Sequence, residues 1–281
     1  MPEPFSLLLS VWAGDRSDDL VQAFRSTVDE QTRRPDQVVV VRDGPVGAEV
    51  AGCLDELLRT SPVETELVTL PDNLGLGPAL DTGLAHCAHD VVARMDADDI
   101  SLPHRFEVQL PVVESGVDIV GSGLLEFGAD RRDVVGRRTP PTQPEQIAAR
   151  SRFADPFNHP TVVYRAAAVR AVGGYQDLPL MEDYLLFAKM IANGARVANV
   201  AEPLVCYRVG AGAYARRGGL GLLRSELRLQ RRFRELGFTT RGQYARNVVV
   251  RGGYRLVPEA VRRSAYQRLI ASYGERRARR T

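Results

Sequence analysis

The sequence predicts an α/β fold built on a mixed, mostly parallel β-sheet flanked by helices. Over the first 100 residues, short runs rich in valine and leucine alternate with amphipathic stretches, which is typical of βαβ units. The run "FSLLLSVW" (5–12) is almost continuously apolar, as expected of a strand covered on both faces. With 281 residues, 44% of them hydrophobic, the chain can bury a sizeable core.

The elements of the first 100 residues follow from this alternation. The spacing of Leu20, Phe24 and Val28 predicts a helix, because these side chains share one helical face. The glycine-rich segment 73–89 predicts a turn that runs into a second helix. The expected strands are 5–12, 37–43, 65–70 and 90–95.

Beyond residue 100 the pattern is less regular. The arginine- and proline-rich segment 130–144 predicts either a hairpin or a loop, and the next helix begins near Met181. The other expected elements are a helix near 104–114 and strands at 117–123, 161–165 and 196–210.

Basic residues are concentrated after residue 210. Residues 211–281 contain 18 arginines against four glutamates, so this segment carries +14 while the first 210 residues carry −12. Amphipathic helices with arginine-rich faces are expected at 222–238 and 257–277. We therefore divide the chain into an α/β domain over 1–210 and a basic helical C-terminal extension over 211–281.

Cysteine usage and hydropathy predict a cytoplasmic protein. Cys53, Cys87 and Cys206 are scattered and odd in number, which favours reduced thiols over a disulfide framework. The N-terminus lacks a basic signal-peptide region, and no stretch approaches the roughly 18 apolar residues of a membrane span.

Polar residues follow three of the predicted strands. In an open parallel sheet, ligands bind outside the carboxyl ends of the strands, so these residues should gather at one edge. Several of them are carboxylates, which repel one another unless a positive group lies among them. A divalent cation, which prefers oxygen ligands, would supply that charge and could hold a diphosphate; a structural calcium-like site and a solvated turn are the alternatives. The residues are Asp43, Asn73, Gly75, Asp96, Asp98 and Asp99.

Six segments, in order and at similar spacing, resemble the family 2 glycosyltransferases and within them the enzymes of bacterial exopolysaccharide synthesis, the amylovoran type included. The resemblance covers roughly residues 5–210 and implies the GT-A fold, with the catalytic domain at 1–210. The segments are "SLLLSVWAGD", "VVVVRDGP", "NLGLGPALDTGL", "ARMDADDISLPHRFEVQ", "NHPTVVYR" and "GGYQDLPLMEDYLLFAKMIANG".

The resemblance implies a donor site at the sheet edge. It assigns Asp43 to the uracil of the nucleotide and Asn73 and Gly75 to the loop that borders it. The alternatives are a turn-forming Asp-Gly pair at Asp43 and a simple turn before a helix at Asn73 and Gly75. Within the D-x-D pair, Asp98 is the implied direct metal ligand, and Asp96 lies nearer the ribose while sharing the metal. The implied cofactor is Mn²⁺ or Mg²⁺, and the donor is a nucleotide-sugar, with a UDP-sugar expected.

The resemblance also implies an acceptor site. Asp183 matches the catalytic base, although two adjacent acids at a helix start also suit the helix dipole. Its neighbour Glu182 is placed on the acceptor side. Asn158 and His159 are expected to line the acceptor pocket, with a metal-binding or structural role for His159 as alternatives, and Arg208 to approach the diphosphate.

These assignments together imply an inverting, metal-dependent transferase that moves a single sugar to a hydroxyl of a lipid-linked or cell-surface glycan in polysaccharide biosynthesis. The chain lacks the Q-x-x-R-W signature of processive polymerases. The alternatives are a sugar-phosphate nucleotidyltransferase, whose glycine-rich loop is missing here, a phosphohydrolase, and an inactive nucleotide-binding scaffold subunit of an assembly complex.

The basic extension suggests a location at the cytoplasmic face of the membrane. Its arginines suit anionic lipid headgroups, although the same helices would also serve as a solubilising surface packed on the catalytic domain. Nucleic acid is not an expected partner, because no aromatic stacking platform accompanies the arginines.

Overall fold

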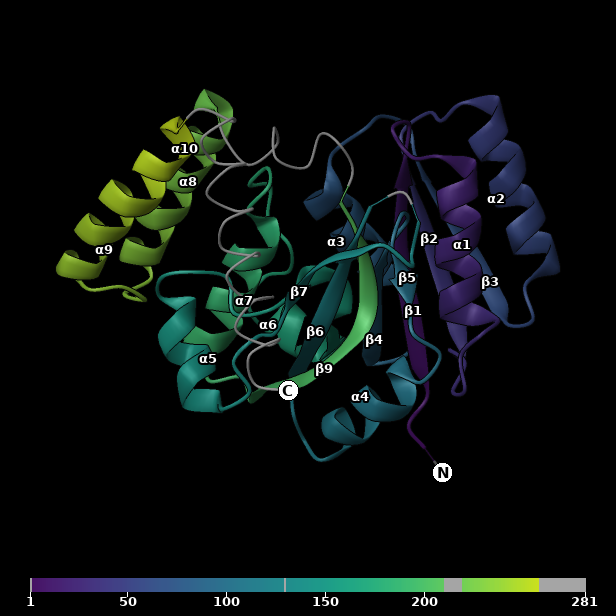
Figure 1. Cartoon of the computed structure of the whole chain (residues 1–281), viewed down its shortest axis with the longest axis horizontal. Coiled ribbons are helices and arrows are strands. Elements are labelled where there is room, and N and C mark those ends of the chain that lie inside the picture. The colour runs from purple at the N-terminus through teal and green to yellow at the C-terminus, as the bar shows by residue number, and fades with distance from the viewer. Residues whose placement is uncertain (1, 129, 210–218, 258–281) are drawn as a thin grey trace. The chain divides into compact units, whose positions relative to one another are not determined.

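The computed structural model describes residues 2–128, 130–209 and 219–257, and it divides into two compact units with the boundary after Arg208. Figure 1 shows strands and flanking helices in the first unit and helices in the second. The mixed, mostly parallel α/β fold predicted from the sequence is confirmed.

Four parallel strands form the N-terminal half of the sheet, in the spatial order β3-β2-β1-β4. They coincide with the strands predicted from the apolar runs. Trp12 lies opposite Asp43, and Ser10 lies opposite Asp96, so neighbouring strands end at a common edge. The strands are β1 (Phe5–Trp12), β2 (Gln37–Asp43), β3 (Glu64–Leu70) and β4 (Val91–Asp96).

The second half of the sheet mixes directions and continues in the order β8-β6-β9-β5. Strand β8 is antiparallel to both β4 and β6, whereas β6 and β9 are parallel. The segment 130–144 contains a strand, β7, antiparallel to β6, so the hairpin alternative was right. The bounds are β5 (Ile100–Ser101), β6 (Ile119–Phe127), β7 (Val134–Arg138), β8 (Val163–Arg165) and β9 (Val197–Arg208).

The helices of the first unit pack on the two faces of the sheet. On one face lie α1 (Ser17–Val28), α2 (Ala48–Thr60) and α4 (Arg105–Glu114). The other face is covered by α3 (Leu76–His86), α5 (Pro144–Ser151), α6 (Ala166–Ala171) and α7 (Glu182–Ala192). Helices α2, α5 and α6 were not predicted. Helices α5 and α6, of eight and six residues, are too short to show a clear period.

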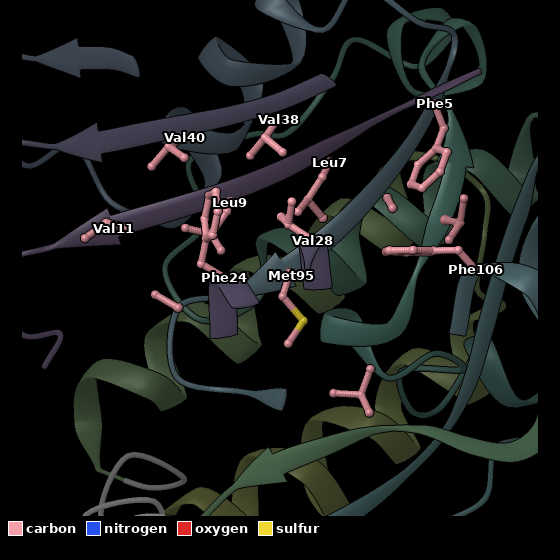
Figure 2. Packing of buried hydrophobic residues seen from close by; sticks show 14 of the residues in the cluster. Phe5, Leu7, Leu9, Val11, Phe24, Val28, Val38, Val40, Met95 and Phe106 are labelled. Atoms are coloured by element: carbon pink, nitrogen blue, oxygen red, sulfur yellow. The ribbon is translucent and has the colours of Figure 1, made fainter. Parts of the chain in front are cut away.

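Strand β1 shows how the sequence divides its side chains between these two layers. Leu7 and Leu9 face α1, where they pack with Phe24 (Figure 2). Leu8 points to the opposite face and joins the core under α3. Alternation along a strand sends successive side chains to opposite faces, so a fully apolar strand is needed where helices cover both.

The second unit is a pair of antiparallel helical segments held by a buried ion cluster. Glu226 is fully buried and forms ion pairs with Arg251 and Arg255, with closest N–O distances of 2.6 and 2.9 Å. Its other partner is the Gln230 amide, at 2.9 Å. The segments are α8 (Leu220–Glu235), α9 (Arg241–Asn247), a π-helical turn (Val248–Gly252) and α10 (Gly253–Leu256).

Helix α8 coincides with the amphipathic helix predicted at 222–238, while the helix predicted at 257–277 lies almost wholly outside the described residues. Among the described residues, no helix combines the length and the apolar character that crossing a bilayer requires.

Replacing Glu226 with glutamine should destabilise the second unit, because two largely buried guanidinium groups lose their ion pairs with this carboxylate. The expected cost is about 3 kcal/mol, which would speed hydrogen exchange of α8 backbone amides by roughly 100-fold. The control is Glu235→Gln on the same helix, whose ion pair with Arg231 is exposed and is worth less than about 1 kcal/mol. Equal exchange rates in the two variants would contradict this account.

Candidate active site

Asp43 ties the end of β2 to the loop that precedes α3. Its side chain is 3% exposed and accepts hydrogen bonds from the backbone N–H groups of Leu74 and Gly75, at 2.7 and 3.0 Å. The Asn73 amide donates to the Asp43 carbonyl at 3.3 Å. Three residues singled out in the sequence therefore lie together, and here they shape the loop.

The approach of the two loops also explains the glycine that follows Asp43. Gly44 has φ +81°, and a Cβ built on it would lie 2.6 Å from the Asn73 nitrogen. A side chain would therefore be strained and would collide with the neighbouring backbone. The Asp-Gly pair is thus required by the close contact between the ends of β2 and β3.

The carboxylates after β4 form a compact cluster. Asp96, Asp98 and Asp99 each present an oxygen, and the three atoms lie within 4.8 Å of one another. Asp99 is fully buried; its Oδ1 accepts from the Arg208 backbone N–H at 2.8 Å. Its Oδ2 has no hydrogen-bond partner among the described residues. A buried, unpaired carboxylate oxygen within a triad of oxygen donors is the arrangement that a divalent cation would complete.

The electrostatics of the cluster reflect this crowding. Burial raises the pKa of Asp98 to about 6, and the neighbouring charge of Asp96 adds to the rise. Burial also raises the pKa of Asp99 well above its usual range. Nearby, burial and the charges of Asp98 and Asp96 raise the pKa of Asp15 to about 7. The ionised cluster therefore opposes folding, and that penalty grows as the pH rises from about 4 toward 7.

Part of the positive charge that offsets these carboxylates comes from an arginine of the chain itself. Arg94 is 1% exposed and forms a bidentate ion pair with Asp96, one of whose bonds is 2.7 Å from Nη1 to Oδ2. A metal alone is therefore not what neutralises the cluster, because Arg94 already pairs with one of its members. Residues 94 and 96 are two positions apart in β4, so their side chains lie on the same face of the strand. This spacing could have predicted the ion pair from the sequence.

Arg208, at the end of β9, is also engaged with the cluster. Its Nε donates to the Asp98 carbonyl at 2.9 Å, and its guanidinium lies 3.0 Å from an Asp19 oxygen. The same group stacks over the Phe127 ring at 4.6 Å from the centroid. Arg208 thus lies beside the D-x-D pair in this structure, held there by the chain's own carboxylate and carbonyl groups.

Asp183 is the second residue of α7 and is not part of the acidic cluster. Its Oδ1 accepts from the Tyr184 backbone N–H at 2.7 Å, and its Oδ2 lies 3.7 Å from Nδ1 of His159. Burial raises the pKa of Asp183; the charge of Arg94 acts against that rise and the charge of Asp96 adds to it. The field of the Arg94–Asp96 pair therefore reaches both acidic groups.

The other residues named for the acceptor side have distinct surroundings. Burial, followed by the charge of Asp183, raises the pKa of Glu182 to about 7. The Asn158 amide donates to the Ser122 carbonyl at 2.8 Å, which is a contact within the fold. His159 is 8% exposed and is not among the clustered candidate metal ligands in the part of the chain that the structure describes.

Sequence comparison places the chain among known enzymes. Residues 13–172 match the family described as Glycosyl transferase family 2. An uncharacterized glycosyltransferase of Haemophilus influenzae is 38% identical over 95% of this chain and 98% of that protein. The amylovoran biosynthesis glycosyltransferase AmsE of Erwinia amylovora is 35% identical (94% and 98%). An Escherichia coli UDP-Gal:alpha-D-GlcNAc-diphosphoundecaprenol beta-1,3-galactosyltransferase is 33% identical (96% and 97%).

Solved structures share the fold at lower identity. S. aureus TarS 1–349 in complex with UDP-GlcNAc superposes with a TM-score of 0.64 at 16% identity, over 88% of this chain and 70% of that one. The mannosyltransferase PcManGT from Pyrobaculum calidifontis, in complex with GDP-Man and Mn²⁺, gives 0.60 at 17% identity, over 99% and 82%. The GT-A fold expected from the sequence motifs is confirmed, and the chain belongs to the family 2 glycosyltransferases.

Proposed function

We propose that this glycosyltransferase moves one sugar from a UDP-sugar to a hydroxyl of a lipid-linked or cell-surface glycan, with inversion and with a divalent metal. The observation that carries the proposal is the presence of two separate acidic groups, in both of which the charge of Arg94 opposes the rise in pKa that burial causes. One group is the cluster of Asp96, Asp98 and Asp99, and the other is Asp183. The first suits a metal-bound diphosphate and the second suits a general base.

The donor set fits Mn²⁺ or Mg²⁺. All three acids of the cluster offer hard oxygen ligands, and the unpaired Asp99 Oδ2 indicates that the cluster is incomplete. Asp98 and Asp96 would hold the ion; a carboxylate paired with arginine keeps lone pairs for a second partner. When bound, the ion supplies positive charge that stabilises the departing diphosphate.

Asp183 is proposed to act as the base. It would take the proton of the acceptor hydroxyl as that oxygen forms a bond to the anomeric carbon. The bond from this carbon to the diphosphate oxygen breaks, and its electron pair leaves with the nucleotide. Because the attack comes from the face opposite the leaving group, the configuration inverts. A carboxylate with a raised pKa is a stronger base for this step than an ordinary aspartate.

The names of the relatives support the substrate classes. One relative is a UDP-Gal transferase whose acceptor is a diphosphoundecaprenol-linked sugar, and another acts in amylovoran biosynthesis. Both match nearly the whole of this chain. A UDP-sugar donor, a lipid-linked acceptor and a role in polysaccharide biosynthesis are therefore proposed here too.

Asp98→Asn and Asp96→Asn should separate metal binding from folding. Asp98→Asn should weaken Mn²⁺-dependent UDP binding at least tenfold without lowering the melting temperature, because ionised Asp98 is unfavourable in the folded protein. Asp96→Asn should also cost about 3 kcal/mol of stability, since it leaves the buried Arg94 charge unpaired. UDP titrations with and without Mn²⁺, and melting curves of metal-free protein, measure both effects. Unchanged UDP affinity in Asp98→Asn would contradict the metal assignment.

Asp183→Asn should remove sugar transfer while leaving donor binding within about twofold. General-base catalysis contributes roughly 10²–10⁴-fold to a rate, so turnover with a UDP-sugar and a lipid-linked acceptor should fall by that factor. Mn²⁺-dependent UDP affinity of the same variant serves as the control for folding. Turnover equal to that of the unmodified enzyme would remove Asp183 from the mechanism.

We also propose that the basic extension binds an anionic membrane surface. The described part of α8 exposes arginines to solvent, and exposed apolar side chains such as Val249 and Val250 lie in the same unit. Arginine with apolar side chains is the combination found on helices that lie at lipid interfaces. The exposed arginines of α8 are Arg224, Arg228, Arg231, Arg232 and Arg234.

Replacing Arg224 and Arg228 together with glutamine should weaken binding to phosphatidylglycerol vesicles. Each arginine near an anionic surface contributes about 1 kcal/mol, so the pair should account for roughly 30-fold in affinity. Arg59→Gln with Arg132→Gln, which removes two exposed charges from the first unit, is the matched control. Equal vesicle binding by both double variants in a co-sedimentation assay would count against a lipid-binding extension.

A further inference from the structure

His159 lies between Tyr175 and the proposed base. The residue begins a 3-10 turn (His159–Thr161) before β8, and its ring packs against the rings of Tyr175 and Phe187, with centroids 5.9 and 5.8 Å away. Nε2 lies 3.1 Å from the Tyr175 hydroxyl oxygen, and Nδ1 lies 3.7 Å from Oδ2 of Asp183. The two ring nitrogens thus face different partners.

The surroundings determine which nitrogen carries the proton. Burial lowers the pKa of His159 well below its ordinary value, and the charge of Arg94 acts in the same direction, so the ring is neutral. A neutral imidazole has one donor and one acceptor nitrogen. With the proton on Nε2, the Nδ1 lone pair would face the carboxylate of Asp183. With the proton on Nδ1, the N–H faces the carboxylate, and Nε2 accepts from the Tyr175 hydroxyl; this tautomer satisfies both contacts.

Tyr175 is itself held by α3. Its backbone N–H donates to Oδ1 of Asp81 at 2.9 Å. The preceding Gly174 has φ +64°, and a Cβ built there would lie 2.0 Å from the same oxygen, so the turn needs glycine. The "GGY" segment, to which the donor and base assignments give no role, thus brings the Tyr175 hydroxyl to His159.

We propose that His159, whose Nε2 is held by the Tyr175 hydroxyl, is a positioning residue that directs an Nδ1–H at Asp183 and orients its carboxylate toward the acceptor hydroxyl. The inference rests on the proposed role of Asp183 as the base. At 3.7 Å the contact is longer than a hydrogen bond, and such contacts commonly shorten when the substrate binds. It also gives His159 a role other than ligating the metal.

Two amide substitutions at His159 test the direction of this contact. The amide nitrogen of asparagine sits near the place of Nδ1, and that of glutamine near the place of Nε2. His159→Asn should keep kcat within about fivefold, whereas His159→Gln should lower it by 10- to 100-fold, the loss expected when a catalytic group is misplaced by about 1 Å. The KM for the donor and the Mn²⁺-dependent UDP affinity should stay within twofold in both variants.

The controls separate this inference from the proposed function. Equal kcat values for the asparagine and glutamine variants, whether high or low, would overturn the positioning role while an inactive Asp183→Asn variant left the base assignment intact. An Asp183→Asn variant that retained full turnover would overturn both. If the His159 variants fail to bind UDP, the test passes to Tyr175→Phe, which removes only a hydroxyl. We expect this variant to lose at least fivefold in kcat. A kcat equal to that of the unmodified enzyme would reject the proposal.

Discussion

The ion pair between Arg94 and Asp96 is the interaction on which the rest of the candidate active site depends. A guanidinium that is almost fully buried is stable only with a well-placed partner, and Asp96 provides a bidentate one. The pair lies at the end of the central strand β4, and Asp96 is itself part of the acidic cluster. Because the charge of Arg94 changes the pKa of both Asp98 and Asp183, one buried cation influences the two halves of the site.

The position of this pair follows from the alternation of side chains in β4. Val91, Ala93 and Met95 join the core beneath α1 and α4, while Val92 joins the core beneath α3 and α7. Arg94 and Asp96 fall on the same side as Val92, and the charge of Arg94 acts on Glu182 and Asp183 of α7. The strand therefore presents an apolar surface to one layer of helices and the polar part of the site to the other.

Local pattern was enough to predict the sheet edge and its acidic residues, but not the contacts among them. Consecutive parallel strands follow from apolar runs, and Asp43, Asn73 and Gly75 come together because strands β2 and β3 are neighbours. Tyr175 meets His159 through segments 16 residues apart, and Arg208 reaches the cluster only because β9 pairs with β5. Such contacts depend on how the mixed half of the sheet and its connecting segments pack, which no periodicity in the sequence specifies.

The acidic cluster and Asp183 both place carboxylates in buried surroundings, but the groups that surround them differ. Burial disfavours the charge on both. In the cluster, carboxylates raise one another's pKa, and the unpaired Asp99 Oδ2 remains to be satisfied, a combination that favours a cation of higher charge than arginine. The charge of Arg94 opposes the effect of burial on Asp183, as it does on Asp98, and a neutral histidine lies beside Asp183. Within the described part of the chain, the two acidic groups thus differ in their neighbours: the cluster offers three carboxylates to the proposed ion, whereas Asp183, the proposed proton acceptor, has a neutral histidine beside it rather than a cationic ion-pair partner.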